Sequence, residues 1–181
     1  ISLVQVAEGA LNETHSILQR MNELATQAAN DTNTSTDRTA IQSEIDQLTS
    51  EVNRIQSTTQ FNSMNLLDGT FSSKNLQVGS LSGQSIGISI KNMNASSLGV
   101  DALKVSSFAS AGSSMDKIQS AINLVSTQRS TLGALQNRLE HTINNLNTTA
   151  ENTQAAESRI RDVDMATEMV EYSKNNILAQ A

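Results

Sequence analysis

SSMDKIQSAINLVSTQRSTLGALQNRLEHTINNL, residues 113–146, is the stretch that decides the fold of this chain. Apolar residues recur in it at steps of three and four, and the whole of 113–181 contains no proline and one glycine. This spacing predicts one long α-helix over 113–181, roughly 90 Å long at about 1.5 Å per residue and therefore rod-like, which needs partner helices to bury its apolar face. That face consists of Ile118, Ile122, Val125, Leu132, Leu135, Leu139, Ile143, Leu146, Ala150, Ile160 and Val163.

Two shorter helices are predicted in the first third of the chain. The first carries apolar residues at steps of four and three from Leu3 to Ala28, and the polar run NDTNTSTD at 30–37 ends it near Asn30. Ser35 or Thr36 is expected to cap the second helix, which ends before Phe61. Because the connection is short, we expect an antiparallel hairpin with the long helix packed along it. The second helix has the most regular spacing, with Ile41, Ile45, Leu48, Val52 and Ile55.

The stretch 61–112 has a different character and holds six of the eight glycines. Residues 76–78 and 86–90 alternate with period two, and Asp68-Gly69 is a turn signal between apolar residues, so this stretch predicts β-hairpins and no helix. Ser113 or Ser114 is expected to begin the long helix. The predicted fold is mainly α: an elongated, coiled-coil-like bundle of three long helices with a small β-hairpin segment at one end. Its parts are 1–60, 61–112 and 113–181.

Composition excludes several classes of function. The net charge is −6 and the 12 basic residues are scattered, so no basic stripe for nucleic acid is present. No apolar run approaches the roughly 18 residues of a membrane span, so we expect no membrane partner. Cysteine and tryptophan are absent, with one tyrosine and three phenylalanines. The core is therefore expected to be aliphatic, as a helical bundle allows.

No constellation in the sequence predicts catalysis. His15 and His141 are each isolated from metal-ligand spacings, and we expect both to be solvated on helix faces. The charges at 159–164 could suggest acid–base work or a divalent cation, but Ile160 and Val163 are expected to face inward and leave those charges as solvated helix pairs. The sequence predicts no enzyme, no cofactor and no metal.

Four segments resemble bacterial flagellin, the subunit of the flagellar filament. AEGALNETHSILQRMNELATQAAN (7–30) and TTQFNSMNLLDG (58–69) are similar to the N-terminal signature of that family. LGALQNRLEHTINNL (132–146) and AESRIRDVDMATEM (156–169) are similar to its C-terminal signature. These segments cover both helical portions, whereas 72–112 matches nothing in the family and lies where flagellins insert variable outer domains.

The resemblance implies a structural function in motility. The chain is expected to be the rod-like D1 domain without its terminal D0 segments, and to be a filament subunit outside the cell that is secreted through the flagellar export apparatus. Its implied partners are other flagellin subunits and, for the full-length protein, an export chaperone and an assembly factor. The fragment alone is expected to be monomeric in dilute solution, an expectation that light scattering would overturn if tubes formed with concentration.

The resemblance also implies recognition by Toll-like receptor 5, a vertebrate innate immune receptor. The residues that match the receptor-binding motif are Gln19, Arg20, Glu23, Leu24 and Gln27 on the first helix, with Glu44 as their acidic partner on the second. Arg20, Leu24 and Gln27 share one side of a helix, although Leu24 also falls on the apolar face. Met21 and Asn22 depart from strongly stimulating flagellins, which often carry valine and arginine there.

Two alternatives remain open from the sequence. The chain could serve as a soluble recognition module through its receptor-binding face. It could also be a non-flagellar elongated helical adhesin or spacer, which predicts tandem repeats at a constant period, and the sequence contains none.

Overall fold

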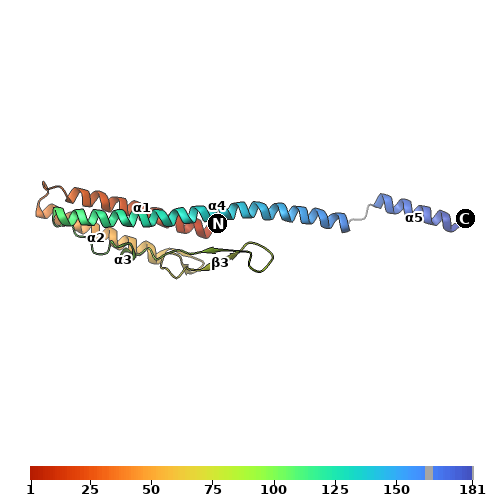
Figure 1. Ribbon diagram of the computed structural model, residues 1–181, viewed down its shortest axis with the longest axis horizontal. Helices are drawn as coiled ribbons and strands as arrows, with labels where there is room; N and C mark the ends of the chain where they lie inside the picture. Colours follow the sequence, from red (N-terminus) through yellow and green to blue (C-terminus); the bar gives the residue numbers. More distant parts are fainter. Residues whose placement is uncertain (162–164, 181) are drawn as a thin grey trace. The chain divides into compact units, whose positions relative to one another are not determined.

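The computed structural model describes residues 1–161 and 165–180. The chain divides into two compact units, Ile1–Glu140 and His141–Ala181. The first unit contains α1 (Ser2–Ala28), α2 (Ser35–Thr58), four short strands, α3 (Ala95–Leu98) and the beginning of α4 (Phe108–Arg161). Figure 1 labels the helices. The end of α4 and α5 (Met165–Gln180) lie in the second unit.

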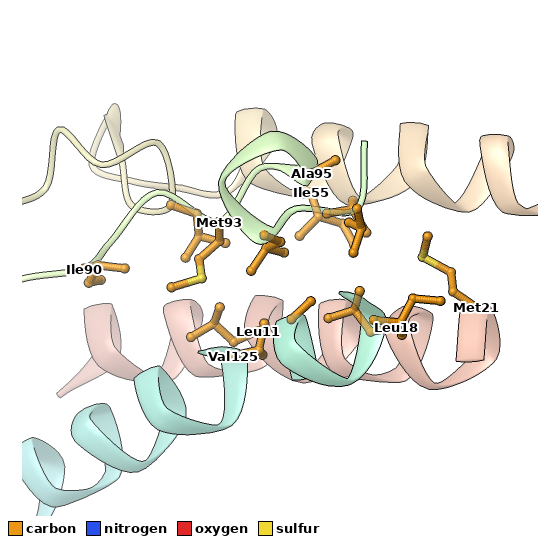
Figure 2. Packing of buried hydrophobic residues seen from close by; sticks show 14 of the residues in the cluster. Leu11, Leu18, Met21, Ile55, Ile90, Met93, Ala95 and Val125 are labelled. Atoms are coloured by element: carbon orange, nitrogen blue, oxygen red, sulfur yellow. The ribbon is translucent and has the colours of Figure 1, made fainter. Parts of the chain in front are cut away.

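An aliphatic core joins α1, α2 and the first part of α4. Leu11 and Leu18 of α1 and Val125 of α4 lie opposite Ile55 and Met93 across this core (Figure 2). The predicted helix spacing is confirmed here, because most of the buried residues follow one another at steps of three, four or seven, which keep them on one face of each helix. They are Val4, Ala7, Leu11, Leu18, Met21, Leu24, Ala25 and Ala28 in α1, Ile41, Ile45, Val52 and Ile55 in α2, and Ile118, Ala121, Val125, Leu132 and Leu139 in α4.

The N-terminus of α2 is capped by Thr34, so the prediction of Ser35 or Thr36 is wrong. The Thr34 hydroxyl accepts the backbone N–H of Asp37 at 3.3 Å, and the Asp37 carboxylate accepts the backbone N–H of Thr34 at 2.9 Å. An acidic residue three positions after a threonine forms this reciprocal capping box, and only Thr34 has one at that spacing. The backbone N–H and then the hydroxyl of Thr34 lower the pKa of the Asp37 carboxyl below its usual value.

Asp37 is expected to stabilise the fold in a pH-dependent manner. Because its pKa is lowered in the folded state, its contribution is complete above the usual aspartate pKa of about 3.9 and is lost as the pH falls through the folded value. Asp37→Asn should therefore lower the thermal midpoint near neutral pH, and this deficit should shrink as the pH falls below about 4. Thermal unfolding followed by circular dichroism at several pH values tests this, with Asp101→Asn, a change at an exposed turn residue, as the control. A lowering of the thermal midpoint by Asp37→Asn that is the same at every pH would contradict the prediction.

The predicted β-hairpin segment is confirmed, with two antiparallel strand pairs. β3 (Lys74–Gln77) pairs with β4 (Ser85–Ile88) so that Leu76 lies opposite Ile86, and β1 (Gln60–Phe61) pairs with β2 (Met64–Asn65). Ile86, Ile88 and Ile90 are buried in the core cluster. The Asp68-Gly69 signal does produce a turn, in which the Asp68 carboxylate accepts the Thr70 N–H at 2.9 Å, but no described strand flanks it.

The turn between β1 and β2 has an unfavourable backbone conformation. Asn62 and Ser63 have φ angles of 50° and 62°, and Ser63 is not a residue that adopts the left-handed region readily. Glycine adopts this region without the steric cost of a Cβ atom. The chain therefore carries local strain at Ser63.

Ser63→Gly should stabilise the protein because it relieves this strain. The expected gain in the free energy of unfolding is about 1 kcal/mol, which is the order of the left-handed penalty less the added chain entropy of glycine. Urea denaturation followed by circular dichroism measures it. Ser63→Ala keeps the Cβ atom and should bring no gain, so equal stabilisation by both variants would argue against strain.

The prediction that 61–112 contains no helix is wrong in two places. The first is α3, whose N-terminus is capped by two side chains: Asn94 Oδ1 accepts the Ser97 N–H at 2.6 Å, and Asn53 Oδ1 of α2 accepts the Ala95 N–H at 2.9 Å. Gly99 ends this helix with a φ of 74°. The cap from Asn53 comes from a distant part of the chain, so the local pattern did not reveal it.

The second place is the start of α4, which begins at Phe108 and not at Ser113. The Ser107 hydroxyl accepts the Ser110 N–H at 3.2 Å, and the Ser110 hydroxyl accepts the Ser107 N–H at 2.9 Å. This reciprocal arrangement places Gly112 inside the helix. The predicted count of three long helices is not confirmed, since the described residues form five helices, among which α4 ends at Arg161 and α5 begins at Met165.

A short extended segment before α4 is held by two helices. Gln42 of α2 donates from Nε2 to the Leu103 carbonyl at 3.0 Å, and its Oε1 accepts the Val105 N–H at 3.0 Å. Ser114 of α4 accepts the Lys104 N–H at 3.1 Å and donates to the Lys104 carbonyl at 2.8 Å. Both edges of residues 103–105 are therefore satisfied by side chains.

The second unit has no buried core among its described residues. Ile143 and Leu146 are 43% and 41% exposed, and Ile160 is 88% exposed, so the prediction that Ile160 faces inward is wrong. Val163, predicted to do the same, lies outside the described residues. Helical spacing specifies an apolar face, but it does not specify that another helix covers that face. No helix among the described residues is long and apolar enough to cross a membrane.

Candidate functional site

Arg20 joins the two helices of the hairpin on their exposed side. Its Nε and Nη2 each lie 2.9 Å from Glu44 Oε1 on α2, and its Nη1 lies 3.2 Å from Glu23 Oε2 on α1. Half of the Arg20 side chain is exposed, and both carboxylates are solvent-accessible. The structure thus brings together three of the six residues that the sequence resemblance implies, including the pair from different helices.

The electrostatics of this cluster hold the guanidinium in place. The hydrogen bond with Glu44 raises the pKa of Arg20 above its usual value, and the hydrogen bond with Glu23 adds to that effect. Two carboxylates and one guanidinium carry a net negative charge. A partner surface that binds here must offer hydrogen-bond donors to the carboxylate oxygens and hydrogen-bond acceptors to the arginine.

The flanking residues of the motif have different environments. Gln19 is exposed, and its Nε2 lies 3.1 Å from His15 Nε2 one turn earlier. Gln27 is exposed two turns further along α1, where its carbonyl accepts a hydrogen bond from Asn33 Nδ2. We call Gln19, Arg20, Glu23, Gln27 and Glu44 the Arg20 patch.

Leu24 is placed differently from the other motif residues, because its side chain is 2% exposed and belongs to the core. It lies on the apolar face of α1 that the sequence pattern had also assigned to it. Leu24 therefore packs in the core beneath the Arg20 patch and contributes no exposed surface to it.

His15 was not among the candidate residues, and the expectation that it is simply solvated is wrong. It is half-buried, and its Nδ1 is buried without a hydrogen-bond partner among the described residues. The four-residue spacing to Gln19 was the signal that could have indicated the contact. His141 is exposed, as expected.

The charged residues at 159–164 form no catalytic or metal-binding arrangement in the part that is described. Arg161 pairs with Glu157 one turn earlier at 3.2 Å, as expected for a solvated helix face. Asp162 and Asp164 lie outside the described residues. Among residues 1–161 and 165–180, no three His, Cys, Asp or Glu side chains gather as metal ligands would.

Comparison with known proteins identifies the family. The family model for the bacterial flagellin N-terminal helical region matches residues 1–72, and that for the C-terminal helical region matches residues 115–181. Flagellin of Halalkalibacterium halodurans is 51% identical over 183 residues, which cover all of this chain and 67% of that protein. The chain belongs to the flagellin family.

Other flagellins give the same result. Flagellin of Bacillus subtilis is 49% identical over 216 residues, covering all of this chain and 71% of that protein. The crystal structure of Bacillus cereus flagellin matches with a TM-score of 0.71 and 34% sequence identity, over 86% of this chain and 90% of that one. The fold with its helices and small strand pairs is thus a flagellin fold.

Family membership settles the class of function. This flagellin is a structural protein and not an enzyme, and its place is the bacterial flagellum, whose filament lies outside the cell. The alternative of a non-flagellar adhesin or spacer is excluded by the same comparisons.

Proposed function

We propose that this flagellin packs side by side with other flagellin subunits in the flagellar filament and thereby serves motility. The observation that carries the proposal is the similarity to flagellins over the whole chain. The subunit corresponds to the D1 region of the family and reaches the cell exterior through the flagellar export apparatus. In the full-length protein an export chaperone and an assembly factor bind it before assembly.

The exposed apolar side chains of the second unit support an assembled state. Contiguous apolar surface on a soluble protein marks an interaction site more often than a solvated face. Apolar atoms dominate the groove along α5, which Ser173 and Lys174 also line. The most exposed of its apolar residues are Met169, Val170, Ile177 and Leu178, which are 59–69% exposed.

Ile177→Asp tests the assembly proposal in the bacterium that encodes this chain. A charge on the apolar face of α5 should prevent close packing, so swimming in soft agar and filaments seen by electron microscopy should both be lost. Asn176→Asp places the same charge on the neighbouring exposed position and should keep both.

Two outcomes would count against this proposal. Normal filaments with Ile177→Asp would show that the apolar face of α5 is not buried by assembly. Loss of filaments with both variants would point to an effect of charge alone. Thermal unfolding of the purified chains checks that the first unit remains folded in each case.

We propose further that the Arg20 patch is the surface recognised by Toll-like receptor 5. Supporting it are the match of the motif at 19–27 and the bond between Arg20 and Glu44, which fixes the guanidinium at an exposed position between two helices. Arginine is enriched among residues that dominate binding energy, since it offers five donors in a fixed plane. Leu24 holds the helix face from within the core.

Arg20→Ala tests the receptor proposal. Titration calorimetry with the purified receptor ectodomain should show binding by the wild-type chain and at least about tenfold weaker binding by the variant, as for a central interface arginine. Arg54→Ala is the matched control. Arg54 is an exposed arginine of α2 and, like Arg20, is paired with a glutamate three residues away, Glu51 at 2.6 Å. Its binding should be unchanged.

The receptor proposal fails if the wild-type chain does not bind, or if both arginine variants weaken binding equally. Neither result would affect the proposal of filament assembly, which is tested separately at α5.

A further inference from the structure

We infer that a groove between α2 and the extended segment before α4 binds a small tetrahedral oxyanion, either phosphate or sulfate. The groove has a volume of about 310 Å³, at the lower end of the range for small-molecule sites. Its lining consists of Ser35, Arg38, Thr39, Gln42, Lys104 and Ser106. We call it the basic groove, and it is separate from the Arg20 patch.

The two walls of the basic groove are fixed by hydrogen bonds. One wall is a face of α2 that carries Ser35 and the residues three, four and seven positions after it, namely Arg38, Thr39 and Gln42. The opposite wall is the segment 103–105, which Gln42 and Ser114 hold on both edges. The backbone that carries Lys104 is therefore held at a set place across the groove from Arg38.

Arg38 is pre-oriented by contacts with the end of α1. Its Nε donates to the Ala28 carbonyl at 3.1 Å, and its Nη2 donates to the Asn30 carbonyl at 3.4 Å and to Asp31 Oδ1 at 3.3 Å. The side chain is 17% exposed. No residue within 1–161 or 165–180 accepts a hydrogen bond from Nη1. The N–H groups of Nη1 are therefore donors that no described residue uses.

The lining of the basic groove offers donors and no carboxylate. The Gln42 amide is fully engaged, because its Nε2 also donates to Asp46. The Lys104 ammonium and the Ser35 hydroxyl have no hydrogen bond with a described residue and complete the donor set with Arg38. Asp31 offsets part of the Arg38 charge, so Lys104 supplies most of the net positive potential.

This donor set fits an oxyanion better than a neutral or cationic ligand. Charge-assisted hydrogen bonds from arginine and lysine are the strongest available to an anion at a protein surface. A tetrahedral anion presents acceptors in several directions and can bond to both walls at once. The lining carries two cations and no carboxylate, and Asp31, which pairs with Arg38 from outside the lining, offsets part of one of those charges.

Nuclear magnetic resonance titration of the ¹⁵N-labelled chain tests the inference. Inorganic phosphate added at constant ionic strength should shift the amide signals of residues 35–42 and 103–106 in a saturable way. Lys104→Gln should weaken the binding about fivefold, the effect of losing one charge-assisted hydrogen bond at a partly exposed site. Lys104→Arg should restore it.

Lys117→Gln is the matched control, because Lys117 is an exposed lysine of α4 outside the groove. The Lys117→Gln variant should bind phosphate with the same affinity as the wild type. Parallel titrations with sulfate and with glucose 6-phosphate distinguish a free ion from a phosphate ester as the preferred ligand. Shifts that do not saturate, or that Lys104→Gln and Lys117→Gln reduce equally, would overturn the inference and indicate general screening of charge.

Discussion

The first unit depends on the burial of a single aliphatic face on α1. Leu11, Leu18 and Met21 are fully buried there, and α2 and α4 bring their own apolar residues to the same core. Each leucine removed from water contributes about 1.5–3 kcal/mol, and most of the stability of a helix in a protein comes from packing such an apolar face rather than from helix propensity. The helices therefore stabilise one another, and neither the strands nor α3 have a core of their own.

Charge contributes little to this stability and is free to serve recognition. The ion pairs of Arg20, Arg54 and Arg161 all lie on exposed helix faces, where water and salt weaken them. Arg38 is the exception, because it is mostly buried and bonds to carbonyl groups at the end of α1. Arg38 of α2 thereby caps the C-terminal end of α1. The surfaces of this flagellin can therefore differ in charge while the apolar core is kept.

The parts of this structure that the sequence predicted are those with a regular local pattern. Ile41, Ile45 and Val52 repeat at helical spacing and are buried, and the alternation around Leu76 and Ile86 corresponds to paired strands. The Arg20 patch was found by resemblance to a family motif, and helical spacing alone would have left Arg20 as one solvated charge among several.

The parts that were missed depend on contacts between distant residues or on choices among similar neighbours. Thr34, Ser35 and Thr36 are all capping residues, and only the reciprocal bond with Asp37 selects the first of them. The cap that Asn53 gives to α3 spans 42 residues and leaves no local pattern. Ile160 has the spacing of a core residue, but burial requires a covering surface that no periodicity records.

The side-chain bonds of Gln42 to Leu103 and Val105 close a long excursion of the chain, because they join residues 61 and 63 positions apart. All four strands and α3 lie between these anchor points, and both ends of the excursion are tied to helices of the core. The entropy of closing a loop grows only with the logarithm of its length, by about 0.6 kcal/mol per doubling. The turn between β3 and β4 can therefore lengthen, even to the size of an additional domain, without loosening the helices beneath it.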